Sequence, residues 1–117
     1  MEYLLLIYGS EADDKKRSAA EYGQIYQEYM AFTQDITKSG KNKGGNPLEP
    51  SATATTVRVR NGKTVVTDGP FAETKEQLGG YYLVEAKDLD EAISIAARIP
   101  GAKYGSIEVR PIRKMNM

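Results

Sequence analysis

Three stretches of the chain have the apolar pattern of β-strands. YLLLIY at 3–8 is apolar at every position, which is typical of a strand covered on both faces, because a half-solvated strand alternates. GYYLVEA at 80–86 is also apolar on both faces, and SIEVRPI at 106–112 predicts a last strand. Pro111 cannot donate a ladder hydrogen bond, so we expect this last strand at or near an edge of the sheet.

A hairpin is predicted in the middle of the chain. TTVRVR at 55–60 alternates between apolar and polar residues, and KTVVT at 63–67 provides the returning strand. The Asn-Gly pair at 61–62 is the strongest short signal for a two-residue turn between them. The preceding segment, 40–54, has three glycines and two prolines without periodicity. It predicts a long loop with room for a short edge strand at 46–48.

A long helix is predicted after a polar loop at 10–17. Ser18 and Glu21 have the spacing of a capping box, which places the helix start at Ser18. Ser39 and Gly40 provide its end. The apolar stripe of this helix consists of Tyr22, Ile25, Tyr29, Phe32 and Ile36.

A shorter helix is predicted near the end of the chain. Asp88 and Glu91 repeat the capping-box spacing, and Pro100-Gly101 ends the pattern. Small alanines in its stripe favour close packing on a sheet. The stripe consists of Leu89, Ala92, Ile93, Ala96 and Ile99.

The resulting order, β-α-β-β-β-α-β, is typical of an α+β fold of the ferredoxin-like, split β-α-β kind. Such a fold has an antiparallel sheet with both helices on one face. No repeat or linker divides the chain, so we expect one domain over 1–117.

The strand at 3–8 is apolar on both faces, although two helices can cover only one face of a sheet. Alternate residues point to opposite faces, and an exposed apolar sheet face is unusual in a monomer. We therefore expect a homodimer that packs sheet against sheet about a two-fold axis. The two apolar sets of this strand are Tyr3, Leu5, Ile7 and Leu4, Leu6, Tyr8.

Composition excludes several classes of function. Sixteen basic residues balance 16 acidic ones, and no basic stripe is present, so nucleic acid is not an expected partner. The chain has no cysteine and no histidine, which removes disulfides, zinc sites with nitrogen or sulfur ligands, and the commonest proton shuttle. Residues 4–8 are too few to span a bilayer, and Glu2 replaces a basic leader, so we expect a cytoplasmic protein without membrane attachment.

Candidate chemistry is densest around residues 68–76, DGPFAETKE, which we call the DGPF loop. Asp68 follows the hairpin at a tight turn, where a carboxylate can accept backbone N–H bonds or face a cleft. Asp68 or Glu73 could act as a general base. Arg58 or Lys75 could stabilise a developing oxyanion, and Tyr81 or Tyr82 could add a phenol, with Tyr82 as the candidate for the ligand site.

Each of these residues also has a purely structural interpretation. Asp-Gly-Pro is ordinary turn chemistry, and Arg58 has the position of a residue on the solvated side of a strand. Glu73 and Lys75 would usually belong to a solvated loop. A magnesium or calcium site made only of carboxylates is not supported by any ligand spacing, and no metal or other cofactor is predicted.

The whole chain resembles the DGPF-domain branch of the YciI-like (YCII-related) proteins. The resemblance is carried by YLLLIYG at 3–9, GGNPL at 44–48 and, above all, TDGPFAETKEQLGG at 67–80. It implies a dimeric α+β barrel built from ferredoxin-like protomers, with a possible small-molecule site in a cleft between sheet, helix and hairpin. Some members are encoded beside extracytoplasmic-function sigma factors. The candidate histidine–aspartate pair of the wider group cannot be carried over, because this chain has no histidine.

Two functions remain open at this level. The first is a homodimer that binds a small molecule near the DGPF loop, either as a binding protein or as an enzyme that uses carboxylate acid–base chemistry. The second is a non-catalytic protein-interaction or regulatory module associated with a sigma factor. The sequence identifies neither the ligand nor the reaction.

Overall fold

The structure is a computed structural model that describes residues 1–115, so the last two residues of the predicted 1–117 domain lie outside the described residues. Its strands are β1 (Glu2–Gly9), β2 (Asn42–Pro47), β3 (Thr55–Arg60), β4 (Lys63–Asp68), β5 (Gln77–Glu85) and β6 (Ser106–Pro111). Its helices are α1 (Glu11–Asp14), α2 (Ala19–Lys38) and α3 (Leu89–Ala97), with short 3₁₀ turns η1 (Ser51–Thr53) and η2 (Pro100–Lys103).

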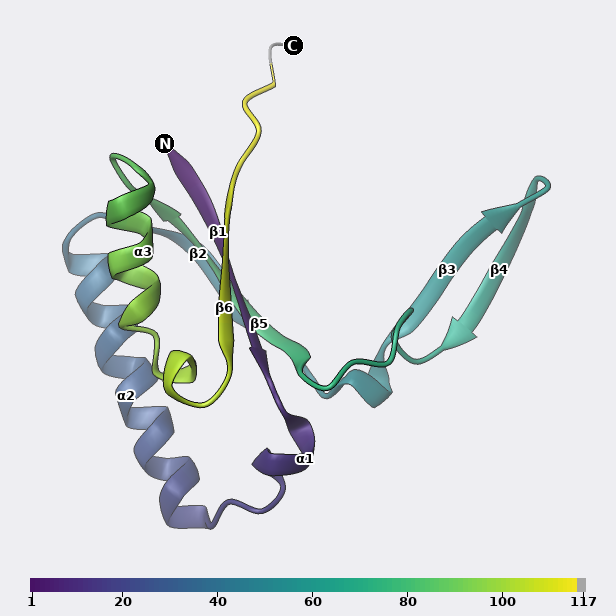
Figure 1. The fold of residues 1–117 in the computed structure, drawn as a ribbon, viewed down its shortest axis with the longest axis horizontal. Helices are drawn as coiled ribbons and strands as arrows, with labels where there is room; N and C mark the ends of the chain where they lie inside the picture. The colour runs from purple at the N-terminus through teal and green to yellow at the C-terminus, as the bar shows by residue number, and fades with distance from the viewer. Residues whose placement is uncertain (116–117) are drawn as a thin grey trace.

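The main sheet has the strand order β2-β5-β1-β6, and every neighbouring pair is antiparallel. Helices α2 and α3 lie on the same side of this sheet (Figure 1). The α+β, ferredoxin-like fold is therefore confirmed. Strand β6, which contains Pro111, lies at an edge as expected.

The predicted hairpin does not join the main sheet. Strands β3 and β4 pair only with each other, and β2 takes the edge position beside β5. The short edge strand allowed at 46–48 is thus a six-residue strand that begins at Asn42. Glycine permits its close pairing, because a Cβ on Gly45 would lie 2.6 Å from the carbonyl oxygen of Tyr81.

The hairpin projects from the body of the molecule as a two-stranded arm, residues 55–68 (Figure 1). Its turn residues Asn61 and Gly62 have φ angles of 51° and 74°, as a turn of type I′ requires. The arm makes the chain extended: the radius of gyration is 16.3 Å, compared with about 13 Å for a compact chain of this length.

The capping prediction for α2 is confirmed. Ser18 Oγ accepts a hydrogen bond from the Glu21 amide at 3.1 Å, and Glu21 Oε1 accepts one from the Ser18 amide at 3.0 Å. The predicted loop at 10–17 is partly wrong, because Ser10 caps the single turn of α1 through the Asp13 amide.

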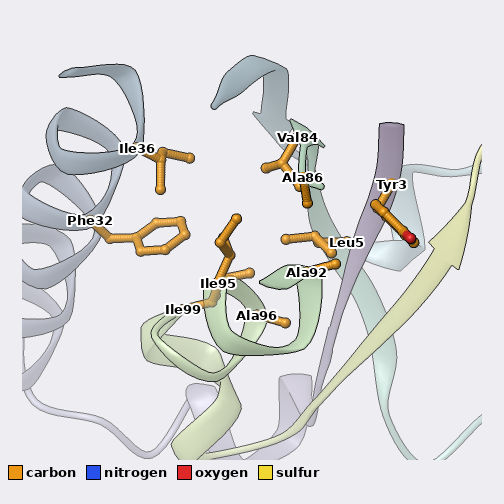
Figure 2. Close-up of a cluster of buried hydrophobic side chains, with 10 residues drawn as sticks. All are labelled: Tyr3, Leu5, Phe32, Ile36, Val84, Ala86, Ala92, Ile95, Ala96 and Ile99. Atoms are coloured by element: carbon orange, nitrogen blue, oxygen red, sulfur yellow. The ribbon is translucent and has the colours of Figure 1, made fainter. Parts of the chain in front are cut away.

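The core lies between the two helices and one face of the sheet (Figure 2). The side chains of Leu5, Ile36 and Val84 are fully buried. Within this layer the Tyr82 ring packs edge-on against Phe32, with 5.1 Å between ring centroids. The buried hydrophobic residues are Tyr3, Leu5, Phe32, Ile36, Val84, Ala86, Ala92, Ile95, Ala96 and Ile99.

Some residues of the apolar stripes predicted for the two helices are exposed in the structure. In α3, Leu89 and Ile93 remain 48% and 49% exposed, whereas Ile95 is buried. Ala92 and Ala96 lie against the sheet, and this contact rotates the neighbouring Ile95 into the core. In α2, Tyr22 is exposed and donates its hydroxyl hydrogen to the Asp14 carbonyl oxygen at 2.7 Å.

Candidate functional site

The sheet face opposite the helices is apolar at its centre. Leu4 lies beside Leu83, and Leu6 beside Tyr81, in the antiparallel register of β1 and β5. Because side chains alternate, these residues point away from the helix side that buries Tyr3 and Leu5. We call this surface the open face; its apolar members are Leu4, Leu6, Tyr8, Leu78, Tyr81 and Leu83, all only partly buried.

One end of the open face carries hydrogen-bonding groups. Asn46 of β2 lies beside Tyr81 in the register, and its Nδ2 donates to the Tyr81 hydroxyl oxygen at 2.9 Å. Within residues 1–115, the Tyr81 hydroxyl donates no hydrogen bond of its own, so its proton is available to a ligand. Tyr8 lies on the same face, beside Leu78 at the start of β5. Tyr8 therefore lies near the start of β5, close in sequence to the DGPF loop, and the Asn46–Tyr81 pair lies at the middle of β5 on the same face.

The root of the arm is held by Glu11, a residue that the sequence did not single out. The Glu11 carboxylate accepts hydrogen bonds from the Ser51 amide at 2.7 Å and from Ser51 Oγ at 2.6 Å. Its backbone amide donates to Gln77 Oε1 at 2.9 Å, and Gln77 Nε2 donates to the Thr74 carbonyl oxygen at 2.5 Å. Glu11 thus connects the segments before and after the arm. The S-x-x-D spacing of Ser10 and Asp13 is the signal that could have marked this turn.

The hydrogen bonds from Ser51, first from its hydroxyl and then from its amide, lower the pKa of Glu11 below the ordinary 4.5. Because folding lowers the pKa of this carboxyl group, its contact with Ser51 is complete above pH 4.5. The contact is lost as the pH falls through the lower pKa of the folded state. We expect the Ser51 amide proton shift in NMR spectra to titrate with a midpoint below 4.5. Glu11→Ala should abolish this titration and speed exchange of the Ser51 amide roughly tenfold at neutral pH.

Glu49→Ala removes a neighbouring exposed carboxylate that makes no hydrogen bond within residues 1–115 and serves as the control. It should leave the titration and the exchange rate of Ser51 unchanged. An unaltered Ser51 amide in the Glu11→Ala protein would contradict the assigned role of Glu11.

The structure places Asp68 and Arg58 on opposite faces of the arm. Asp68 pairs with Thr55 and Arg58 with Val65, so alternation puts Asp68 on the face of Val57 and Val66. The Asp68 side chain is exposed and makes no ion pair or hydrogen bond with another of residues 1–115. The turn after it is held by backbone contacts: the Gly69 amide donates to the Ala54 carbonyl oxygen at 2.7 Å, with a Gly69 φ of 94°.

The other three predicted site residues do not gather around Asp68 and Arg58. Glu73 and Lys75 are exposed in the DGPF loop. Tyr82 lies on the helix-covered face of β5, where its hydroxyl is 2.7 Å from Thr33 Oγ1. The phenol on the open face belongs to Tyr81, the neighbouring residue. The five residues therefore occupy four separate places in one chain: the two faces of the arm, the DGPF loop and the helix-covered face of β5.

A hollow of about 490 Å³ lies on the other side of the sheet, between α2 and the segment from α3 to η2. Phe32 and Ile99 contribute to its apolar lining. The charged groups beside it are already paired, with 2.6 Å between Arg98 Nη1 and Asp35 Oδ2 and 3.1 Å between Lys103 Nζ and Glu28 Oε1. This pairing leaves these four charged groups of the groove occupied by one another.

Within residues 1–115, the structure has neither a cluster of metal ligands nor a helix that could span a membrane. Residues 1–115 contain no group of three or more acidic side chains arranged to hold a metal ion. None of the helices in that part of the chain is long and apolar enough to cross a membrane.

Comparisons with known proteins agree with this fold. A solved structure of 5-chloro-2-hydroxyhydroquinone dehydrochlorinase (TftG) from Burkholderia phenoliruptrix AC1100, in complex with 2,5-dihydroxybenzoquinone, matches with a TM-score of 0.56. It is 17% identical in sequence, and the match covers 97% of this chain and 94% of that one. An uncharacterised protein of Rhizobium meliloti (strain 1021) is 39% identical over 114 residues, which are 96% of this chain and 92% of that protein. Residues 1–116 match the YCII-related domain, and the chain therefore belongs to the YCII-related family.

Proposed function

We propose that the protein is a homodimer that binds a small, planar, oxygen-bearing molecule between the open face and a DGPF loop. The observation that carries this proposal is the amount of surface left uncovered by one chain. The chain exposes 8529 Å², compared with about 6,300 Å² for a folded monomer of 12.9 kDa. The excess of about 2,200 Å² is larger than the roughly 800 Å² that each partner buries in a standard interface and lies in the range of obligate dimers.

The open face has the composition of a site for an aromatic or quinonoid ligand. Tyr8 and Tyr81 offer ring surfaces, and Leu6 offers an apolar floor. The Tyr81 hydroxyl and the Asn46 amide can bind oxygen atoms at the ligand edge. The dehydrochlorinase bound to 2,5-dihydroxybenzoquinone supports this ligand class at the level of the fold.

An enzymatic role would rest on carboxylates. Asp68 is the exposed acid of the DGPF loop, and Glu73 is the second candidate for a general base. Arg58 or Lys75 would then stabilise negative charge on the ligand. Because the chain has no histidine, Asp68 and Glu73 are the general-base candidates of this site.

We expect 2,5-dihydroxybenzoquinone to raise the melting temperature of the wild-type protein in a thermal-shift assay. Tyr81→Ala should weaken its binding at least about tenfold by calorimetry, because both a ring contact and a hydrogen bond are lost. Tyr104→Ala, at an exposed tyrosine on a different surface, is the matched control. Equal affinities of the Tyr81 variant and the wild type would contradict the site.

A second candidate function is a non-catalytic interaction or regulatory module. The exposed side chains of Tyr22, Tyr26 and Met30, spaced four residues apart on α2, favour a protein-binding surface. Mass spectrometry of the ligand after long incubation separates a catalytic from a non-catalytic protein. A bound compound that is recovered unchanged supports a non-catalytic protein, and a converted one supports the enzyme.

A further inference from the structure

The arm carries an apolar face that its own chain leaves uncovered. Val57, Val59 and Val66 are 60%, 61% and 61% exposed, and Val57 lies directly opposite Val66 in the register. The main sheet provides no neighbouring strand for β3 or β4. A two-stranded hairpin without packing is marginally stable in water, so this face needs a covering surface.

The other face of the arm is basic. It carries Arg58, Arg60 and Lys63, and the register places Arg60 directly opposite Lys63, a like-charge pair that is unfavourable by itself. Because the basic face lies opposite the valine face, the two faces meet different surroundings, and the valine face is the one that lacks a cover.

The area of the uncovered surface points to a second copy of this chain as the covering partner. A standard interface takes about 800 Å² from each partner. The excess of about 2,200 Å² estimated above is more than twice this amount. It is large enough to include the arm in addition to the open face.

We propose that, in the homodimer, the arm of each chain packs with its valine face on the other chain and completes the ligand site of that chain. Asp68 is on the valine face at the root of the arm, so its carboxylate is directed at the second chain. Each site then combines Asp68 from one chain with Tyr81 and Asn46 from the other. This inference rests on the proposed dimer, and it accounts for the lack of a partner for Asp68 among residues 1–115.

The absence of native cysteine allows a direct test by cross-linking. The cysteine of the Val59→Cys protein is labelled with a benzophenone maleimide. Labelled ¹⁴N and ¹⁵N chains are mixed to form dimers and irradiated, and the cross-linked peptides are identified by mass spectrometry. We expect mainly mixed-isotope peptides that join the arm to the second chain. Val65→Cys, on the opposite face of the arm, is the matched control. The same label at this position should give few cross-links to the second chain.

The cross-linking result separates the failure of this inference from the failure of the proposed function. A dimer in sedimentation equilibrium whose Val59→Cys cross-links stay within one chain would overturn the arm exchange and leave the dimer intact. A monomer at all concentrations would overturn both.

Complementation tests the composite site itself, with 2,5-dihydroxybenzoquinone as the probe. Homodimers of Asp68→Asn and of Tyr81→Ala should each lose binding. A heterodimer of the two variants, purified through two different tags, should regain one site, which is half of the wild-type capacity. A heterodimer without any binding would show that Asp68 and Tyr81 act within the same chain and would overturn the proposal, as would an Asp68→Asn homodimer with wild-type affinity.

Discussion

Leu83→Glu is expected to convert the proposed dimer into folded monomers. Leu83 lies on a central strand of the open face, beside Leu4 of β1 and Gly44 of β2. Burying a leucine contributes about 1.5–3 kcal/mol, and burying an unpaired carboxylate is costly in addition. Two-fold symmetry applies the change twice, so we expect a loss of at least about 4 kcal/mol, or a Kd raised roughly 1,000-fold. Sedimentation equilibrium measures this directly.

A matched control separates loss of the interface from loss of the fold. Leu89→Glu places the same charge at an exposed leucine in the first turn of α3, where a carboxylate is compatible with the helix dipole. It should remain as dimeric as the wild type. A Leu83→Glu protein that sediments like the wild type would show that the open face is not the dimer interface.

Leu5→Ala is expected to cause the largest loss of stability within one chain. Leu5 is fully buried on the helix side of β1, between Tyr82 of β5 and Val109 of β6 in the register. Truncation of a buried leucine to alanine costs about 2–5 kcal/mol, through lost burial and the cavity that remains. With a urea m-value of about 2 kcal/mol/M, the unfolding midpoint should fall by roughly 1–2.5 M.

The control for this change is Ile93→Ala, at a half-exposed position of α3. It should shift the urea midpoint by a small fraction of that amount, because little buried surface is lost. Both variants must be compared at the same chain concentration, since dimerisation adds to the apparent stability. A small shift for Leu5→Ala would mean that the core collapses around the missing side chain.

Local signals in the sequence were sufficient for most element boundaries. The capping box of Ser18 and Glu21 and the positive φ angles of Asn61 and Gly62 depend on neighbouring residues alone, and both are found as expected. The two-sided apolar pattern of 3–8 was also informative, because strand geometry forces alternate residues to opposite faces. One set faces the helices and the other forms the open face.

Features that depend on contacts between distant elements could not be predicted from local sequence signals. Strand β2 has no apolar alternation, because its glycines serve backbone pairing with β5. The helical stripe of α3 was ambiguous, because its apolar residues cover much of the circumference and the contact with the sheet selects Ile95 over Ile93. The role of Glu11 depends on Ser51, which is 40 residues away.

The candidate site also has some features that the residue types indicated and others that only the tertiary structure shows. Residue types indicated that histidine and cysteine take no part in any acid–base chemistry, which made Asp68 and Glu73 the general-base candidates. The tertiary structure decided the rest: Tyr81 and not Tyr82 faces the open side, and Asp68 and Arg58 lie on opposite faces of the arm. Sequence by itself determined most of the elements, the caps of the two long helices and the apolar surplus of the sheet, because these follow from local geometry. Only the tertiary structure showed that the hairpin leaves the sheet, because strand partners are chosen by contacts between distant segments.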